Sequence, residues 1–552
     1  MISVILIWIY MIITCYLTGY AVLWLLAEKQ GYSIKNSSSY LYAGIVAVTV
    51  YAQFFSIFYK VGCMANVILL IICGIIAFYF RKELCIRLGI MLKGITPIKA
   101  MAFILIFLLF AYGTSTGIIH YDTGLYHAQS IRWIEEYGVV PGLGNLHNRL
   151  AYNSASFCLS AMYSFAFLGG RSFHCCAGFM AFLLAIACVE RCSKSRIKKP
   201  CLSDFARIMG LYYLLIIFDE MISPASDYFM VLSVFYIIIR WLDLLENNEK
   251  AYIPYALLCL MGVSVVTIKL SGAMILLLTL KPLCRMIKEK KGKQIALFIS
   301  AGFIVAVPFF IRNVILSGWL VYPLTFIDIF NVDFKIPKEL ALYDAREIQV
   351  WGRGYYNVAE FNAPITEWLP GWIGSLSMVN KLFLLLAFLG IFMFIVYCIY
   401  AVIKDKKDMA DTLLVMGTVG SGLIFFILSS PLIRYGCVFL WVFPALVWGY
   451  LYLKATPNFD RYRIFLLGLL LIGVYKTGAF AIEIYQSAAT QYLLVQKDYE
   501  DFETLPYEID GYTFYYSEEG DRTGYKAFPS TPYKMDLILR GDTLKDGFRL
   551  KN

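Results

Sequence analysis

The chain has 552 residues, of which 60% are hydrophobic and only 16% are charged, and its mean hydropathy is +0.68. A soluble protein of this length would carry more charge, so the composition excludes an ordinary set of soluble domains. The net charge of +10 does not indicate nucleic-acid binding, because much of the basic charge lies in short loops between apolar runs.

Apolar runs of about 17–25 residues recur along the chain, and each is long enough to cross a hydrocarbon core of roughly 30 Å. They predict an all-α polytopic membrane protein with about fourteen transmembrane helices. The first run is long and lacks a basic n-region, which argues against a removable signal peptide. The predicted spans are residues 2–26, 39–59, 64–80, 100–118, 172–190, 204–218, 227–243, 252–268, 270–284, 294–312, 380–401, 412–429, 434–453 and 463–482.

Short basic loops predict which ends of these spans face the cytoplasm, since cytoplasmic loops are enriched in Lys and Arg. The basic loops are RKELCIRLGIMLK, RCSKSRIKK, CRMIKEKKGK and KDKK. Both termini and the long loops 119–171 and 313–379 are then expected outside. We divide the chain into N-terminal transmembrane helices (1–99), a membrane domain (100–482) and a small external C-terminal region of α/β type (483–552). At about 70 residues that region is marginal for independent folding, and we expect it to pack on the membrane domain.

The loop 119–171 is predicted to contain two helices. In the first, at about 124–137, one side carries the apolar and aromatic residues Tyr126, Trp133, Ile134 and Tyr137, and the other carries Gln129, Arg132 and Glu136. Such a helix is typical of the membrane interface, where it lies flat. The second, 153–168, is apolar, but a crossing there would place RCSKSRIKK outside, so we expect a juxtamembrane helix that does not cross.

Ionisable residues gather at the predicted external ends of the spans. Charges at membrane depth are costly unless paired or hydrated, so they indicate a functional site. Two carboxylates and three cations facing one cavity could hold a phosphate and activate a hydroxyl. The ionisable residues at the predicted external ends are Asp122, Asp219, Glu220, Asp227, Lys269, Arg312 and Arg434.

Each of these residues also has a purely structural interpretation. Asp122 could be only the N-cap of the following helix. Lys269, Arg312 and Arg434 could extend to the interface as ordinary snorkelling side chains. Asp219 and Glu220 fit a tight turn, DEMISPASD, and are more readily explained as turn residues.

The four histidines, His120, His127, His147 and His174, lie in the loop 119–171 or at its exit. Their spacing matches no metal-ligand pattern, so the sequence leaves a metal site open. Hydrogen bonding of a substrate by His127 or His147 is the favoured interpretation, and Arg149 lies in the same glycine- and amide-rich stretch, GLGNLHNRLAYN. The chain has neither a P-loop nor a dinucleotide-binding fingerprint.

Several short motifs resemble, in order, those of the polyprenyl-phosphate-dependent glycosyltransferases of the GT-C superfamily. They are YDTGLYHAQSIRWIEEYGVVP, NSASFCLSAMYSFAFLGGRSFH, SPASDYFMVLSVFYIIIR, TIKLSG, RNVILSGWLVYP and IRYG. Two features depart from that superfamily: Thr123 follows Asp122 where a second acid is often found, and more spans precede the loop than is usual. The C-terminal FPSTPYKMDLILRGDTLKDGFRLKN is similar to a family of uncharacterised bacterial polytopic membrane proteins, which supplies no function.

The resemblance implies a GT-C-like fold and a glycosyltransferase of cell-surface polysaccharide synthesis in the bacterial inner (plasma) membrane. A sugar on a polyprenyl phosphate would be the donor, and a glycan or lipid-linked molecule the acceptor. Asp122 would be the general base. Lys269, Arg312 and Arg434 would offset charge on the leaving phosphate. Asp227 would position the acceptor or a divalent cation, Mg²⁺ or Mn²⁺, although no cofactor is required by the sequence.

Two other classes of function remain open from the sequence. One is a glycan polymerase or ligase of another fold, and the other is a transporter or lipid-linked sugar flippase. The amphipathic and juxtamembrane helices after Asp122 favour the transferase over the polymerase. Transporters often place charges on broken helices near the bilayer midplane, whereas here the charges are predicted at one surface.

Overall fold

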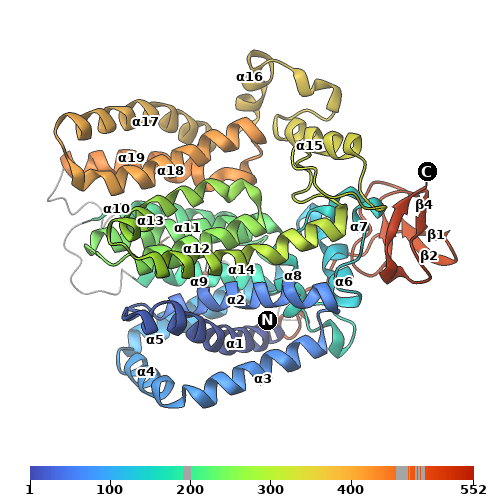
Figure 1. The fold of residues 1–552 in the computed structure, drawn as a ribbon, viewed down its shortest axis with the longest axis horizontal. Helices are drawn as coiled ribbons and strands as arrows, with labels where there is room; N and C mark the ends of the chain where they lie inside the picture. The colour runs from blue at the N-terminus through green and yellow to red at the C-terminus, as the bar shows by residue number, and fades with distance from the viewer. Residues whose placement is uncertain are drawn as a thin grey trace.

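The computed structural model describes residues 1–190, 200–455 and 491–551, together with 470, 471, 473–475, 477, 478, 481, 482 and 485. The basic segment RCSKSRIKK and most of the predicted span 463–482 lie outside these residues. Long helices run roughly side by side through the first two ranges, and a small β region ends the chain (Figure 1).

Apolar helices form the bulk of the chain. Among the described residues, nine helical segments are long and apolar enough to cross a membrane, or ten if the bent pair α3 (Cys63–Tyr79) and α4 (Arg81–Lys93) is one span. The protein is therefore a multi-pass membrane protein. The nine segments are Ile2–Gln30, Ser38–Phe58, Pro97–Thr116, Ser226–Glu246, Leu270–Lys288, Gly292–Ser317, Met378–Ile403, Met409–Ser429 and Ile433–Ala455.

Three further predicted spans are shorter helices: α9 (Cys176–Val189), α10 (Leu202–Ile216) and α12 (Ile253–Ile268), of 14, 15 and 16 residues. At 1.5 Å per residue they are about 21–24 Å long, less than the roughly 30 Å core. Twelve residues of α9 are buried. A buried helix is apolar all round, and hydropathy alone does not separate it from a span.

Helix α11 (Ser226–Glu246) is buried along most of its length. It packs against α9, α10, α12, α18 and α19. The other helices of the bundle include α1 (Ile2–Leu26), α2 (Ser38–Phe58), α5 (Pro97–Thr116), α13 (Leu280–Lys288), α14 (Gly292–Ser317), α17 (Met378–Ile403), α18 (Lys407–Ser429) and α19 (Ile433–Ala455).

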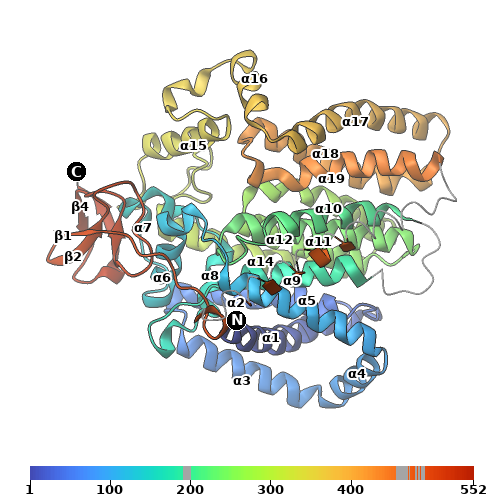
Figure 2. The same ribbon diagram turned by 180° about the vertical axis from the view of Figure 1, so that it is seen from behind.

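Short helices cover one end of this bundle, which we call the tail-side end because the C-terminal strands also lie there (Figures 1 and 2). They are α6 (Ala128–Glu136), α7 (Leu143–Leu146), α8 (Ala155–Met162), α15 (Lys338–Gly352) and α16 (Ile365–Ser375). At eight residues, α8 is about 12 Å long and does not cross a bilayer. All its residues are buried, so it lies inside the protein rather than against lipid.

The C-terminal region, 491–551, is built of strands. β1 (Leu505–Ile509) and β2 (Tyr512–Tyr516) form an antiparallel hairpin, β2 pairs in parallel with β3 (Ser530–Thr531), and β4 (Leu537–Leu539) pairs with β5 (Phe548–Leu550). The hairpin turns at Asp510 and Gly511, whose φ values of 48° and 81° match the Asp-Gly turn favoured between strands. Residues 491–551 contain short 3₁₀ turns but no α-helix, so this is a β region rather than the α/β region predicted.

This tail covers Gln129 and Arg132 on the polar face of α6, whereas Glu136 on the same face is exposed, which corrects in part the prediction of a helix lying flat with that face in water. Gln129 donates hydrogen bonds of 2.8 and 2.7 Å to the carbonyls of Gly524 and Ala527. Arg132 donates to the carbonyls of Tyr525 and Lys526 at 2.6 and 2.8 Å. Gln129 and Arg132 of α6 thus bind the tail backbone. As expected, the tail packs on the rest of the protein.

Candidate functional site

Asp122 stands between the end of α5 and a π-helical turn, Thr123–His127, that leads into α6. It occupies the N-cap position of this turn, but its side chain makes no capping hydrogen bond. Instead its carboxylate Oδ2 lies 2.7 Å from Nη2 of Arg434, in the first turn of α19. The N-cap interpretation of Asp122 is therefore wrong, since the carboxylate is committed to a distant arginine.

Arg434 lies between two carboxylates. Its Nε is 3.5 Å from Oδ2 of Asp227, in the first turn of α11. A carboxylate in the first turn of a helix is favoured by the positive end of the helix dipole. Asp122 and Asp227 are about a hundred positions apart in the sequence, and each lies more than 200 positions before Arg434. One guanidinium joins them.

Lys269 completes the group. Helix α12 ends at Ile268, Lys269 is extended, and a 3₁₀ segment, Leu270–Thr279, follows. The ammonium pairs with the other oxygen of Asp227 and lies 3.6 Å from the centre of the Tyr435 ring. We call Asp122, Asp227, Lys269 and Arg434 the Asp122 cluster; four helix ends bring it together.

The two cations of the Asp122 cluster are more accessible than the two carboxylates. The side chains of Arg434 and Lys269 are 28% and 21% exposed, against 16% for Asp122 and 7% for Asp227. The carboxylates lie on the buried side of the cations and pair with them, and the cations form the more solvent-accessible surface of the cluster. Such a surface is suited to an anionic group, because guanidinium and ammonium groups bind phosphate through charge-assisted hydrogen bonds.

His120 also belongs to this site, although the sequence reasoning favoured His127 and His147. Its Nδ1 accepts a 3.1 Å hydrogen bond from the backbone N–H of Asp122, and its ring contacts Nη1 of Arg434. Burial and the charge of Arg434 lower the pKa of His120, which keeps the ring neutral at neutral pH. In the sequence, the feature that points to His120 as a site residue is its position two residues before Asp122.

The environment of Asp122 holds its carboxyl ionised. Burial alone would raise its pKa, but Arg434 and the nearby His127 and His120 outweigh burial, and the pKa lies below its ordinary value of 3.8. A carboxylate paired in this way is a poor proton acceptor. It becomes a better one when Arg434 turns to another anion, because burial then acts on the pKa with less opposition.

The other residues predicted at the site lie around it. Burial lowers the pKa of both His127 and His147 to about 3, so both rings are neutral, and His127 lies 3.3 Å from the Thr123 hydroxyl through Nδ1. Arg149 pairs with Glu347 at 3.6 Å and stacks on Trp351 at 4.6 Å. In the described part of the chain, none of these three side chains forms a hydrogen bond or an ion pair with the Asp122 cluster.

Arg312 is not part of the cluster, contrary to the prediction. It is only 3% exposed, donates to Oδ1 of Asn153 at 3.1 Å, and bonds the hydroxyl of Ser56. It therefore joins α14 to α2 and to the segment before α8. The sequence placed it at the end of a span, but the span continues to Ser317, which leaves Arg312 more than a turn inside the helix.

The tail contacts the chain on both sides of Asp122. The Tyr121 hydroxyl bonds Asp521, and the N–H groups of Thr523 and Gly524 donate to the carbonyl of Gly124 at 3.0 and 2.9 Å. A Cβ on Gly124 would lie 2.7 Å from the Phe502 ring, so glycine is needed for this approach. The tail thus fixes the backbone that carries Asp122.

Within the described part of the chain, no group of three or more His, Cys, Asp or Glu side chains is placed to hold a metal ion. Asp227, the residue predicted to position a divalent cation, is paired with Lys269 and Arg434 instead. A metal ion at Asp227 would have to displace at least one of these cations.

Comparison with known proteins identifies the family. The model of the family described as "Domain of unknown function (DUF8201)" matches residues 1–441. The chain therefore belongs to this family, and the match includes all four residues of the Asp122 cluster. No curated protein and no solved structure matches the chain.

Proposed function

We propose that this member of the DUF8201 family is an integral membrane glycosyltransferase that moves a sugar from a polyprenyl-phosphate donor to a glycan or lipid-linked acceptor. The observation that carries the proposal is the Asp122 cluster: two carboxylates hold two more accessible cations at one end of the helices. The order of motifs that resembles the GT-C superfamily supports the same reading.

In this proposal Lys269 and Arg434 bind the donor phosphate. The phosphate competes with Asp122 for Arg434, and as the guanidinium turns toward it, the pKa of Asp122 rises. Asp122 then accepts the proton of the acceptor hydroxyl. The hydroxyl oxygen forms a bond to the anomeric carbon, the bond from that carbon to the phosphate oxygen breaks, and the polyprenyl phosphate leaves with the electron pair, stabilised by both cations.

Three finer features belong to the proposal. The fold is of GT-C type, the tail-side end faces the periplasm or exterior, and the membrane is the bacterial inner membrane.

Asp227 holds Lys269 and Arg434 in place and so positions the phosphate rather than reacting. His120, neutral and bonded to the Asp122 backbone, orients Asp122. The product contributes to cell-surface polysaccharide.

Removal of one phosphate-binding cation tests this function. Purified protein in liposomes is mixed with a panel of polyprenyl-phosphate monosaccharides, and release of polyprenyl phosphate is followed with a membrane extract supplying acceptor. Lys269→Gln is expected to weaken donor binding about tenfold or more, since a hydrogen bond to a charged group contributes about 1.5–3 kcal/mol. Lys250→Gln, a change at an exposed lysine beyond the opposite end of α12 from Lys269, is the matched control.

Two results would contradict the proposal. One is donor turnover in Lys269→Gln equal to that of the natural protein. The other is movement of the intact lipid-linked sugar across the liposome membrane without release of polyprenyl phosphate, which is the behaviour of a flippase.

A further inference from the structure

A cavity of about 1250 Å³ opens at the end of the bundle opposite the tail. It lies among α1, α2, α11, α12 and α14, and it is larger than most small-molecule pockets, which span roughly 300–1,000 Å³. Asp227 and Asp243 are 16 residues apart on α11, so the polar end of the cavity is about 24 Å along the helix from the Asp122 cluster. The cavity is therefore a separate feature.

The cavity has one apolar part and one polar part. Side chains near the middle of α2 and α14, including Val50, Ile304 and Val305, form its apolar wall. Ile304 is 65% exposed, which places an opening of the cavity on the outer, lipid-facing side of α14. A hydrocarbon chain could enter there without crossing a polar surface.

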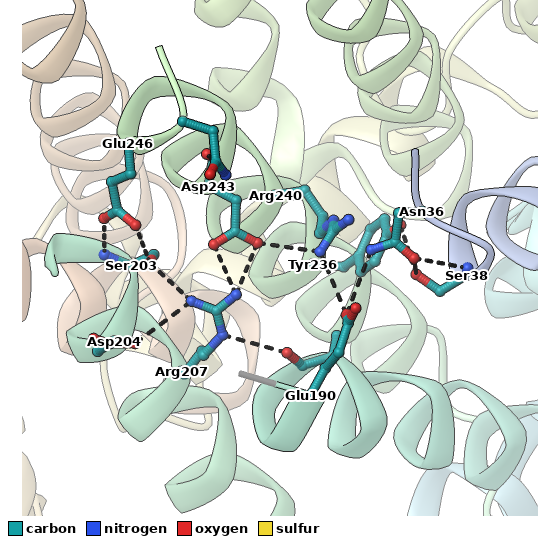
Figure 3. Close-up of polar contacts among 12 residues, drawn as sticks. Asn36, Ser38, Glu190, Ser203, Asp204, Arg207, Tyr236, Arg240, Asp243 and Glu246 are labelled. Carbon is teal, nitrogen blue, oxygen red and sulfur yellow. Dashed lines mark hydrogen bonds and ion pairs between the residues drawn. The ribbon is translucent and has the colours of Figure 1, made fainter. Parts of the chain in front are cut away.

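Charges of both signs form the polar part, as Figure 3 shows. Nη2 of Arg207 donates to both oxygens of Asp243 at 2.7 Å. Nη1 of Arg240 lies 3.1 Å from Asp243 and 3.6 Å from Glu190. Arg240 and Glu190, with side chains 18% and 40% exposed, set a positive and a negative group side by side at the cavity wall.

A buried hydroxyl in the cavity wall has no partner among the described residues. Tyr42 is 3% exposed and stacks on Tyr236, with ring centres 3.5 Å apart, yet its Oη makes no hydrogen bond to that part of the chain. Tyr236 is one turn before Arg240 on α11. Buried polar groups are nearly always hydrogen-bonded, because an unpartnered one loses its bonds to water without replacement. The hydroxyl is closed off from the cavity, so a ligand head in the polar part would satisfy it after a small shift of the Tyr42 or Tyr236 ring.

We propose that this cavity binds a zwitterionic phospholipid, with its acyl chains between α2, α12 and α14. Its phosphate lies against Arg240 and the Tyr42 hydroxyl, and its ammonium lies against Glu190. Among the described residues of the wall, a purely anionic head would meet Glu190, Asp243, Glu246 and Glu249, which outnumber Lys35, Arg207 and Arg240. The mixed wall favours a head with both charges. This proposal does not depend on the transferase activity.

Native mass spectrometry of the detergent-purified full chain tests the site, with phosphatidylethanolamine and phosphatidylglycerol added in turn. We expect one phosphatidylethanolamine to be retained per protein and phosphatidylglycerol to be retained less. Tyr42→Phe removes one oxygen and is expected to lower phosphatidylethanolamine affinity about fivefold, the effect of one hydrogen bond. Ala47→Trp, which fills the apolar part, is expected to abolish retention.

Ile299→Trp is the matched control, because Ile299 is 53% exposed on α14 and does not line the cavity. Retention unchanged in Tyr42→Phe and Ala47→Trp would mean lipid bound only to the outer surface and would overturn the proposal. So would stronger retention of phosphatidylglycerol. If Ala47→Trp does not fold, Tyr42→Phe still decides. Donor turnover should be the same in Tyr42→Phe, which separates this site from the Asp122 cluster.

Discussion

At the scale of single residues, Arg434 is the centre of the site. It contacts Asp122 and His120, which lie in the segment between α5 and the π-helical turn, and Asp227, at the start of α11. Breaking a largely buried ion pair from one side leaves the other charge uncompensated and costs about 3–5 kcal/mol. The sequence placed Asp122, Asp227, Lys269 and Arg434 at one end, because each stands at the end of an apolar run. It did not give their pairing, which depends on the packing of distant helices.

Arg434→Gln is expected to destabilise the protein by about 3 kcal/mol at neutral pH, because it leaves two buried carboxylates without their shared cation. In the natural protein Asp122 has a lowered pKa, so its stabilising pairing is present above pH 3.8 and is lost only as pH falls through the folded-state pKa. In the Arg434→Gln variant, burial without the arginine raises the pKa of Asp122 above its unfolded-state value. Ionisation of Asp122 then lowers the stability of the folded protein as pH rises.

Thermal unfolding in detergent at pH 4.5 and pH 7.5 measures both effects. The loss of stability caused by Arg434→Gln should be larger at pH 7.5 than at pH 4.5. Adding Asp122→Asn should recover part of this stability. Arg285→Gln, at an exposed pair with Glu289, is the control and should change little. An Arg434→Gln protein as stable as the natural one at pH 7.5 would show that the cluster is hydrated rather than buried.

At the scale of elements, the tail and α6 form one unit. The alternation of polar and apolar residues correctly gave α6 two faces, but a polar face predicts only that it is not in lipid. In this structure the C-terminal tail covers Gln129 and Arg132 of that face. Glu135 is buried on α6 and accepts hydrogen bonds from the hydroxyls of Ser172 and Tyr525 at 2.8 and 2.6 Å. Tail docking is therefore linked to the protonation of Glu135.

Docking of the tail is expected to weaken as pH rises. Burial raises the pKa of Glu135 from 4.5 to about 7, with the hydrogen bonds from Ser164, Tyr525 and Ser172 opposing the shift. The contribution of protonated Glu135 to the stability of the docked tail is fully present below pH 4.5 and is lost as pH rises through about 7. Hydrogen exchange of residues 491–551 should therefore be faster at pH 8 than at pH 6, after correction for intrinsic rates.

Glu135→Gln should remove this pH dependence, since the amide stays neutral. Glu136→Gln is the matched control, because Glu136 is the neighbouring residue and is exposed. Equal pH dependence in both variants would assign the effect to another group.

At the scale of the whole molecule, hydropathy predicted where the helices lie but not what surrounds them. Every predicted span within residues 1–190 and 200–455 coincides with a helix, yet α9, α10 and α12 are short and all three pack against the central α11. Lipid and a protein core both select apolar side chains, so composition does not distinguish them. Arg312 shows the same limit, since its partners Ser56 and Asn153 are far away in the sequence.

The two ends of the bundle are predicted to face opposite sides of the membrane, with the tail outside. Single cysteines at Glu518 and Lys250, both exposed, report the two ends in a background with the natural cysteines replaced. A membrane-impermeant maleimide added to intact cells should label position 518 and not 250. Labelling of 250 alone would invert the orientation and place the Asp122 cluster in the cytoplasm.

The most direct test of the account compares Asp122→Asn with Asp219→Asn, a change of the same kind at an exposed turn residue of the tail-side end. Asn cannot accept the proton of the acceptor hydroxyl, so we expect sugar transfer to fall by about 10²–10⁴-fold in Asp122→Asn, with donor binding retained, and to be unchanged in Asp219→Asn. Transfer by Asp122→Asn at the natural rate, with equal expression and folding, would contradict the catalytic role of Asp122.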